Sequence, residues 1–246
     1  SSEFKSPSDH FLSKVNTITE NTNICLVLVI YSHTMRRRQY LATSVSLVAT
    51  AAGCTAVGHA SQPDAYDPTV EFDGEGATVT DEFELEGGIT IAEAVHEGRS
   101  NFIVELVPTD GELTELLVNV IGEFDGATGV IADPGTYLLD VDADGPWEID
   151  ILQPDPAEDR AEPLPVELDG DGPTWDGPFI FEGLARASGT HERDGNFIVE
   201  ILTQDAIAPE LVFNELDQFE GETTFNVLGV GFITVDAAGA WTVTIE

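Results

Sequence analysis

One block of sequence occurs twice in this 246-residue chain, and this repeat constrains the fold more than any other feature. The segment NFIVEL at 101–106 recurs as NFIVEI at 196–201. VDADGPW at 141–147 recurs in the same way as VDAAGAW at 235–241. A spacing of about 95 residues is too long for the unit of a solenoid and fits two whole domains.

Apolar and polar residues alternate within each copy, as expected for strands that bury one face. Phe102 and Val104 fall on one face of a predicted strand, and Ile103 and Glu105 fall on the other. Glycine, aspartate and proline interrupt the alternation every ~8–12 residues, and helical periodicity is absent from this region. The pattern predicts an all-β fold with small antiparallel β-sandwiches of jelly-roll type, and a closed barrel is the alternative.

The predicted layout after residue 54 has four parts. A polar tether at 55–69 leads into a first β-sandwich domain at 70–153, a proline-rich acidic linker spans 154–165, and a second β-sandwich domain spans 166–246. Domains of this size bury a modest core, so their stability depends on large apolar side chains. The expected core anchors are Trp147, Trp241, Phe102 and Phe197.

A short segment at 35–54 has the organisation of an export signal. Met35 is followed by three arginines, then by an apolar run at 41–52 that ends in small residues before Cys54. Arg37 and Arg38 resemble the paired arginines of twin-arginine signals, and AAGC at 51–54 resembles a lipobox.

The chain thus resembles exported twin-arginine lipoproteins of halophilic archaea with two tandem β-rich domains, on the evidence of these motifs, the repeat, and a high content of acidic residues with no lysine after Lys14. The resemblance implies a protein held on the extracellular face of the cell membrane by a lipid on Cys54, or else simple cleavage of the signal at this site. Residues 1–34 precede the signal and are interpreted as an upstream artefact of gene calling or as a disordered segment.

The charge balance is extremely acidic. The chain has 46 acidic residues against 9 lysines and arginines, a formal net charge of −37, and both lysines, Lys5 and Lys14, precede the signal. Such a charge repels itself at moderate ionic strength, whereas at 1 M salt the screening length is only about 3 Å. We therefore expect a protein adapted to high salt. The acidic surface also argues against nucleic acid as a partner.

A weak calcium motif lies at Asp140, Asp142 and Asp144, which have the spacing of acidic residues in a calcium loop. The position at which such a loop needs a glutamate holds Ile151 instead. The competing interpretation, which we favour, is a tight hairpin turn that places a tryptophan in the next strand. No metal or other cofactor is therefore predicted.

Two histidines, His96 and His191, occupy matching positions just before predicted strands. One histidine per domain, without further nitrogen or sulfur ligands, makes a poor transition-metal site. We expect them on the surface or capping turns.

The chain contains no Gly-x-Ser-x-Gly, His-Glu-x-x-His or Gly-x-x-x-x-Gly-Lys motif, and carboxylates this numerous come close to one another by chance. The sequence therefore favours a non-enzymatic surface module that binds a surface protein or a glycan, or that acts as a spacer. The alternative is an extracellular hydrolase or its accessory binding subunit. A cleft with convergent carboxylates in only one of the two copies would favour this alternative.

Overall fold

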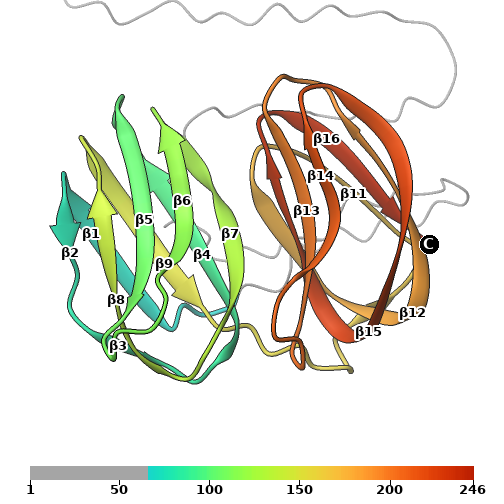
Figure 1. Ribbon diagram of the computed structural model, residues 1–246, viewed down its shortest axis with the longest axis horizontal. Coiled ribbons are helices and arrows are strands. Elements are labelled where there is room, and N and C mark those ends of the chain that lie inside the picture. Colours follow the sequence, from blue (N-terminus) through green and yellow to red (C-terminus); the bar gives the residue numbers. More distant parts are fainter. Residues whose placement is uncertain (1–65) are drawn as a thin grey trace, which may run out of the picture. The chain divides into compact units, whose positions relative to one another are not determined.

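The computed structural model describes residues 66–246, all of which belong to one compact unit (Figure 1). The prediction of an all-β fold is confirmed, since the described residues form strands and turns. No helix in this part of the chain is long and apolar enough to cross a membrane.

The first repeat contains nine strands. They are β1 (Val70–Glu75), β2 (Thr78–Val79), β3 (Phe83–Leu85), β4 (Gly88–His96), β5 (Asn101–Pro108), β6 (Glu115–Ile121), β7 (Phe124–Ala132), β8 (Gly135–Asp142) and β9 (Pro146–Leu152).

These strands form two antiparallel sheets. One sheet has the order β1-β9-β4-β7, and the other has the order β2-β8-β5-β6, with β3 also paired to β8. The chain therefore passes from one sheet to the other after most strands, in the jelly-roll order of a double Greek key, as the sequence pattern predicted. The core between the two sheets includes both expected anchors of this repeat, Trp147 and Phe102, which are 2% and 0% exposed.

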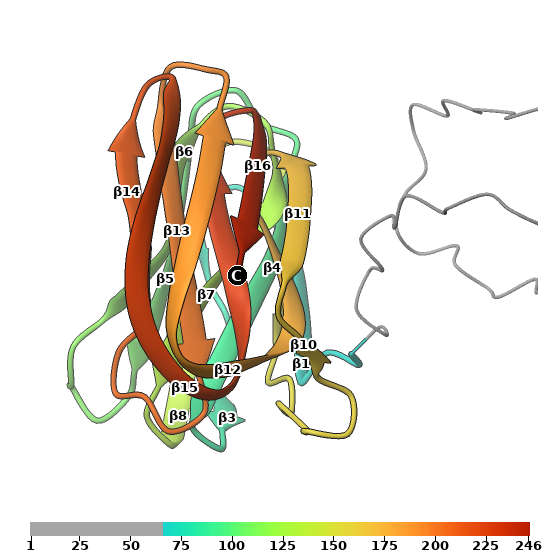
Figure 2. The same ribbon diagram turned by 90° about the vertical axis from the view of Figure 1, so that its right-hand side faces the viewer.

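The second repeat uses fewer, longer strands. They are β10 (Glu162–Pro163), β11 (Val166–Asp171), β12 (Thr174–His191), β13 (Asn196–Thr203), β14 (Glu210–Leu216), β15 (Phe219–Ala237) and β16 (Ala240–Ile245). Figure 2 shows the two longest, β12 and β15, curving side by side. Their pairing joins all seven strands into one hydrogen-bonded sheet, with the order β11-β16-β12-β15-β13-β14 and β10 attached to β12.

The two repeats nevertheless share one register. The pairs Thr78↔Val141, Phe83↔Tyr137 and Gly88↔Ala132 of the first repeat correspond to Thr174↔Val235, Phe179↔Gly231 and Gly183↔Val227 of the second. The first half of β12 thus takes the place of β2 and β3, and its second half takes the place of β4. In the same way β15 takes the places of β7 and β8, so each long strand runs through both layers of a sandwich.

The tryptophan anchors explain a second feature that the copies share, the motifs GEG at 74–76 and GDG at 170–172. Gly74 pairs directly with Trp147, and a Cβ on this glycine would collide with the indole ring. The indole N–H donates a hydrogen bond to the carbonyl of Gly76 at 3.0 Å. The second repeat repeats this arrangement around Trp241, which is 3% exposed. A glycine opposite an aromatic side chain in this way lets the ring lie flat across the neighbouring strand.

The two repeats contact each other directly through a third apolar cluster. β4, β7 and β9 contribute Ile89, Ile91, Ala127 and Leu152, and β12, β13 and β15 contribute Trp175, Leu202 and Phe232. Residues 89–92 of β4 are consequently buried on both faces of the strand. The linker is part of the second repeat's sheet rather than a free spacer, because its strand β10 pairs in parallel with β12.

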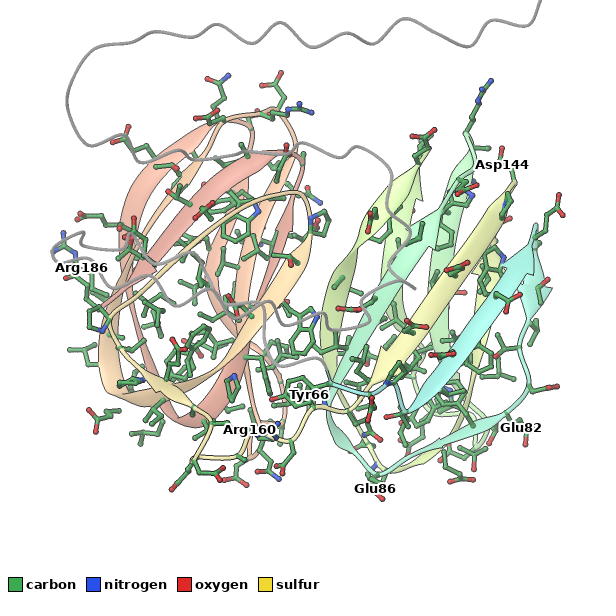
Figure 3. The ribbon with its side chains drawn as sticks, turned by 180° about the vertical axis from the view of Figure 1, so that it is seen from behind. Tyr66, Glu82, Glu86, Asp144, Arg160 and Arg186 are labelled. Atoms are coloured by element: carbon green, nitrogen blue, oxygen red, sulfur yellow. The ribbon has the colours of Figure 1, made fainter. Side chains whose placement is uncertain are left out.

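Aromatic rings and polar groups complete this interface. The ring of Tyr66 lies 5.7 Å from that of Trp175 and 5.9 Å from that of Phe232. Arg160 of the linker lies over the other side of the cluster, 5.1 Å from the centre of the Tyr66 ring (Figure 3). The indole N–H of Trp175 donates a hydrogen bond to Oε1 of Glu93 at 2.9 Å, so the outward face of β4 holds the tryptophan by both packing and polar contact.

Candidate functional site

The residues expected to direct export and anchoring lie outside the described part of the chain. They are Arg37, Arg38 and Cys54, within the signal predicted at 35–54. The functional argument from the structure therefore rests on residues 66–246.

The weak calcium motif is divided between a strand and a turn. Asp140 and Asp142 belong to β8 and are exposed on the outer face of its sheet, whereas Asp144 follows in the turn before β9. Within residues 66–246, no group of three or more histidine, cysteine, aspartate or glutamate side chains is arranged to hold a metal ion.

The expected hairpin at this turn is wrong, because β8 and β9 belong to different sheets. The turn crosses between the layers, and Asp144 fastens it to the turn that follows β4. Its Oδ1 accepts hydrogen bonds from the backbone N–H groups of Ser100 at 2.9 Å and Arg99 at 3.0 Å. The bond from Ser100, together with that from Arg99, lowers the pKa of Asp144. Asp144 therefore has a structural task at this end of the first repeat (Figure 3).

The expectation that the histidines lie on the surface is also wrong. His96 is 1% exposed, and its ring stacks on Phe102 with 4.5 Å between ring centres. His191 is buried in the same way against Phe197 at 5.4 Å. Alternation within a single strand cannot reveal this burial, because the partner ring comes from another strand, on the facing layer of the sandwich.

A hydrogen bond fixes the orientation of each histidine. The Nδ1 atom of His96 lies 2.7 Å from the carbonyl oxygen of Gly122, and that of His191 lies 2.9 Å from the carbonyl oxygen of Asp217. Because a carbonyl only accepts, the proton is assigned to Nδ1 in both rings. The shared histidines, glycines and tryptophans thus build the sandwich, and a functional site is better sought where the two copies differ.

One such difference is a pocket of about 410 Å³ in the first repeat. It lies between the loop that joins β5 to β6 and the turn that joins β7 to β8. This end of the repeat carries Glu86 and is opposite to the end that carries Asp144 (Figure 3). The lining residues are Leu106, Pro108, Glu112, Leu113, Glu115, Ile131, Ala132, Asp133 and Tyr137.

The polar and apolar parts of this lining are separated. Leu106, Ala132 and Tyr137 are buried and form the inner wall, whereas the carboxylates of Glu112, Glu115 and Asp133 are on exposed residues at the rim. The phenol of Tyr137 donates a hydrogen bond to the backbone carbonyl of Asp133 at 2.8 Å, which fixes the position of the ring.

The electrostatic effect of the rim is evident at Tyr137. Burial raises the pKa of this phenol above its ordinary value. Four carboxylates raise the pKa further, in the order Asp133, Asp110, Glu112 and Glu115. A raised phenol pKa means that negative charge is disfavoured at this point, first by burial and then by the neighbouring carboxylates.

The second repeat lacks these features at the equivalent positions. Ile207 stands in place of Glu112, Ala208 in place of Leu113, and Gly231 in place of Tyr137. Asp133 and the proline after it are replaced by the single residue Leu228. The sequence signal for the site was therefore the contrast between TDGELTE at 109–115 and QDAIAPE at 204–210, two segments of equal length. Alternation and motif searches do not detect this contrast.

Fold and site together define a class of protein: a tandem of jelly-roll β-sandwiches with an acidic-rimmed pocket in the first. No protein-family model matches the chain, and no curated protein matches it.

Proposed function

We propose that this chain is a non-enzymatic binding module, adapted to high salt and displayed on the extracellular face of the cell membrane by a lipid on Cys54. The pocket of the first repeat is its binding site. The observation that carries this proposal is the difference between the copies, since the same scaffold forms a pocket of about 410 Å³ in one repeat and replaces Tyr137, Glu112 and Asp133 of its lining in the other. Concave sites with an apolar wall and a few polar groups are the usual form of ligand-binding sites.

Binding to the cell envelope tests this proposal most directly. Leu113 is 87% exposed and lines the pocket, so Leu113→Arg places a cation across its mouth with little risk to folding. Ala208→Arg adds the same charge at the equivalent position of the second repeat and is the matched control. With Cys54→Ser in all three proteins, so that no lipid can hold them, we expect washed envelopes of the host to retain the protein with the unchanged pocket and the control but not Leu113→Arg. Equal retention of all three proteins would refute a role for the pocket.

The anchoring part of the proposal has its own test. In a halophilic archaeal host, the wild-type protein should fractionate with membranes, and its mature N-terminus should be Cys54 with an added lipid mass. Cys54→Ser should remove the lipid mass and make the protein extractable from membranes without detergent, and Arg37→Lys combined with Arg38→Lys should retain it inside the cell. A protein that stays in the cytosol with residues 35–54 intact would refute export.

The second candidate is an extracellular hydrolase or its accessory binding subunit. The convergence of carboxylates on the pocket of the first repeat, two of which the second repeat replaces with apolar residues, is the observation that favours it. Assays of the purified full chain against glycan and peptide substrates decide between the two. Turnover that survives purification and is abolished by one substitution in the pocket would support the hydrolase and refute the non-enzymatic binding module.

A further inference from the structure

The inner wall of the first-repeat pocket suits an apolar body. Leu106, Pro108 and Ile131 line it together with Ala132 and the ring of Tyr137. Its volume of about 410 Å³ lies in the range of small-molecule sites. Apolar groups gain free energy when this wall removes them from water, and that gain does not depend on charge.

The rim of the pocket suits a positive charge. Glu112, Glu115 and Asp133 line it, and the lining contains neither lysine nor arginine to neutralise them. At 1 M salt the screening length is about 3 Å, so a cation gains from these carboxylates only when it touches them. A charged group held at the rim by an apolar body inside the pocket meets this condition, whereas a freely diffusing ion does not.

The aromatic wall adds a further contact for such a ligand. A cation within about 6 Å of an aromatic ring face is attracted to its electron-rich surface. Tyr137 is available for this contact in a fixed position, because its hydroxyl is bonded to the carbonyl of Asp133. An inorganic cation, by comparison, needs several oxygen ligands, and the described residues include no cluster that could hold a metal ion.

From this geometry we infer that the pocket binds a small organic cation, an ammonium or guanidinium group carried on an apolar body. The inference rests on the proposed binding function and names its ligand class. The ligand's apolar body lies against Leu106, Ile131 and Tyr137, and its charge meets the carboxylates at the rim.

Three probes of similar shape and different charge test the inference. They are phenethylammonium, the neutral phenethyl alcohol and the anion phenylacetate, each titrated into the full chain at 1 M and 3 M NaCl by calorimetry. We expect phenethylammonium to bind at least about fivefold more tightly than the alcohol, a difference of ~1 kcal/mol, and phenylacetate to bind most weakly. Binding of the cation should persist at 3 M NaCl, since it depends on direct contact.

A matched pair of variants locates the binding. Glu115→Gln removes one charge from the rim of the pocket, and Glu210→Gln removes the charge at the equivalent position of the second repeat. Both residues are exposed, so neither variant endangers the fold. Glu115→Gln should weaken phenethylammonium binding by about threefold, because one partly exposed charge contact contributes modestly. The control should bind within about twofold of the wild type.

The outcomes separate this inference from the proposed function. Equal affinity for cation and alcohol, an equal loss in the control variant, or no binding of the cation would overturn the inference. The binding module would still stand if Leu113→Arg abolished envelope retention in the same preparation. Conversely, selective cation binding without any effect of Leu113→Arg on envelope retention would support the inference and refute the proposed function.

Discussion

Truncation of Trp175 provides the sharpest test of how the repeats are joined. The side chain is 7% exposed, packs 5.3 Å from the ring of Phe232, and donates a hydrogen bond to Glu93. Burying an indole removes about 150–250 Å² from water, which contributes about 4–6 kcal/mol at ~25 cal/mol per Å². Part of this burial persists in the unfolded chain, so we expect Trp175→Ala to lower the free energy of unfolding by about 3–5 kcal/mol.

Urea unfolding in 2 M NaCl, followed by fluorescence and far-ultraviolet circular dichroism, measures this effect. The two remaining tryptophans, Trp147 and Trp241, report on one repeat each. The wild type should unfold in a single transition, and Trp175→Ala should separate the unfolding of the two repeats. Trp175→Phe should cost less, because it loses the hydrogen bond but keeps most of the packing.

The first repeat supplies the control for this experiment. Val79 occupies the position that corresponds to Trp175 and is 57% exposed, so Val79→Ala should change the free energy of unfolding by less than about 0.5 kcal/mol. The reasoning would be refuted if Trp175→Ala cost less than about 1 kcal/mol. A single unchanged transition in that variant, or an equal cost of Val79→Ala, would refute it too.

Three further predictions concern backbone fit, protonation and salt. Gly74→Ala should lower the free energy of unfolding by about 1–3 kcal/mol, because its Cβ would collide with the indole of Trp147; an unchanged urea midpoint would contradict this. Burial raises the pKa of Asp176 to about 6, so its ionised form is disfavoured in the folded state and costs stability above that pH, a cost that fades as the pH falls toward 4. Asp176→Asn should therefore raise the melting temperature at pH 8 and change it little at pH 4, and an equal effect at both would exclude this cause. The melting temperature of the wild type should rise from 0.2 M to 3 M NaCl because salt screens a net charge of −37, and equal values would contradict adaptation to brine.

Alternation along single strands was sufficient to predict the fold class. In β5, the buried side chains of Phe102, Val104 and Leu106 alternate with more exposed ones, as the sequence pattern indicated. The repeat then implied that both copies share one topology, and their equal registers agree with it. Periodicity works here because each strand's own residues determine which of its faces is buried.

Contacts between distant elements account for what the sequence did not reveal. His96 is buried because Phe102 stacks on it from the opposite sheet, and Trp175 is buried because the other repeat covers it. The pocket depends likewise on the approach of two loops, near residues 112 and 133, that belong to different layers. None of these relations leaves a periodic signal, since each depends on how strands are ordered across two sheets.

The interface between the repeats also explains why the two copies differ on one face. At the outward surface where the first repeat buries apolar side chains against its neighbour, the second repeat carries charged ones. Ile91, Ala127 and Leu152 correspond to Arg186, Glu222 and Glu246. Arg186 donates a hydrogen bond to Glu222, and both side chains are more than half exposed.

The interface joins two different surfaces of the same fold, so each repeat keeps one of these surfaces free. If the repeats were identical, further copies could bind to the free surfaces without limit. Polar replacement of the free surface is what a terminal repeat requires for solubility. The Arg186–Glu222 pair therefore makes this surface of the second repeat unsuited to the apolar contact that the first repeat makes, so the interface accounts for the differences on this face but not for those at the pocket.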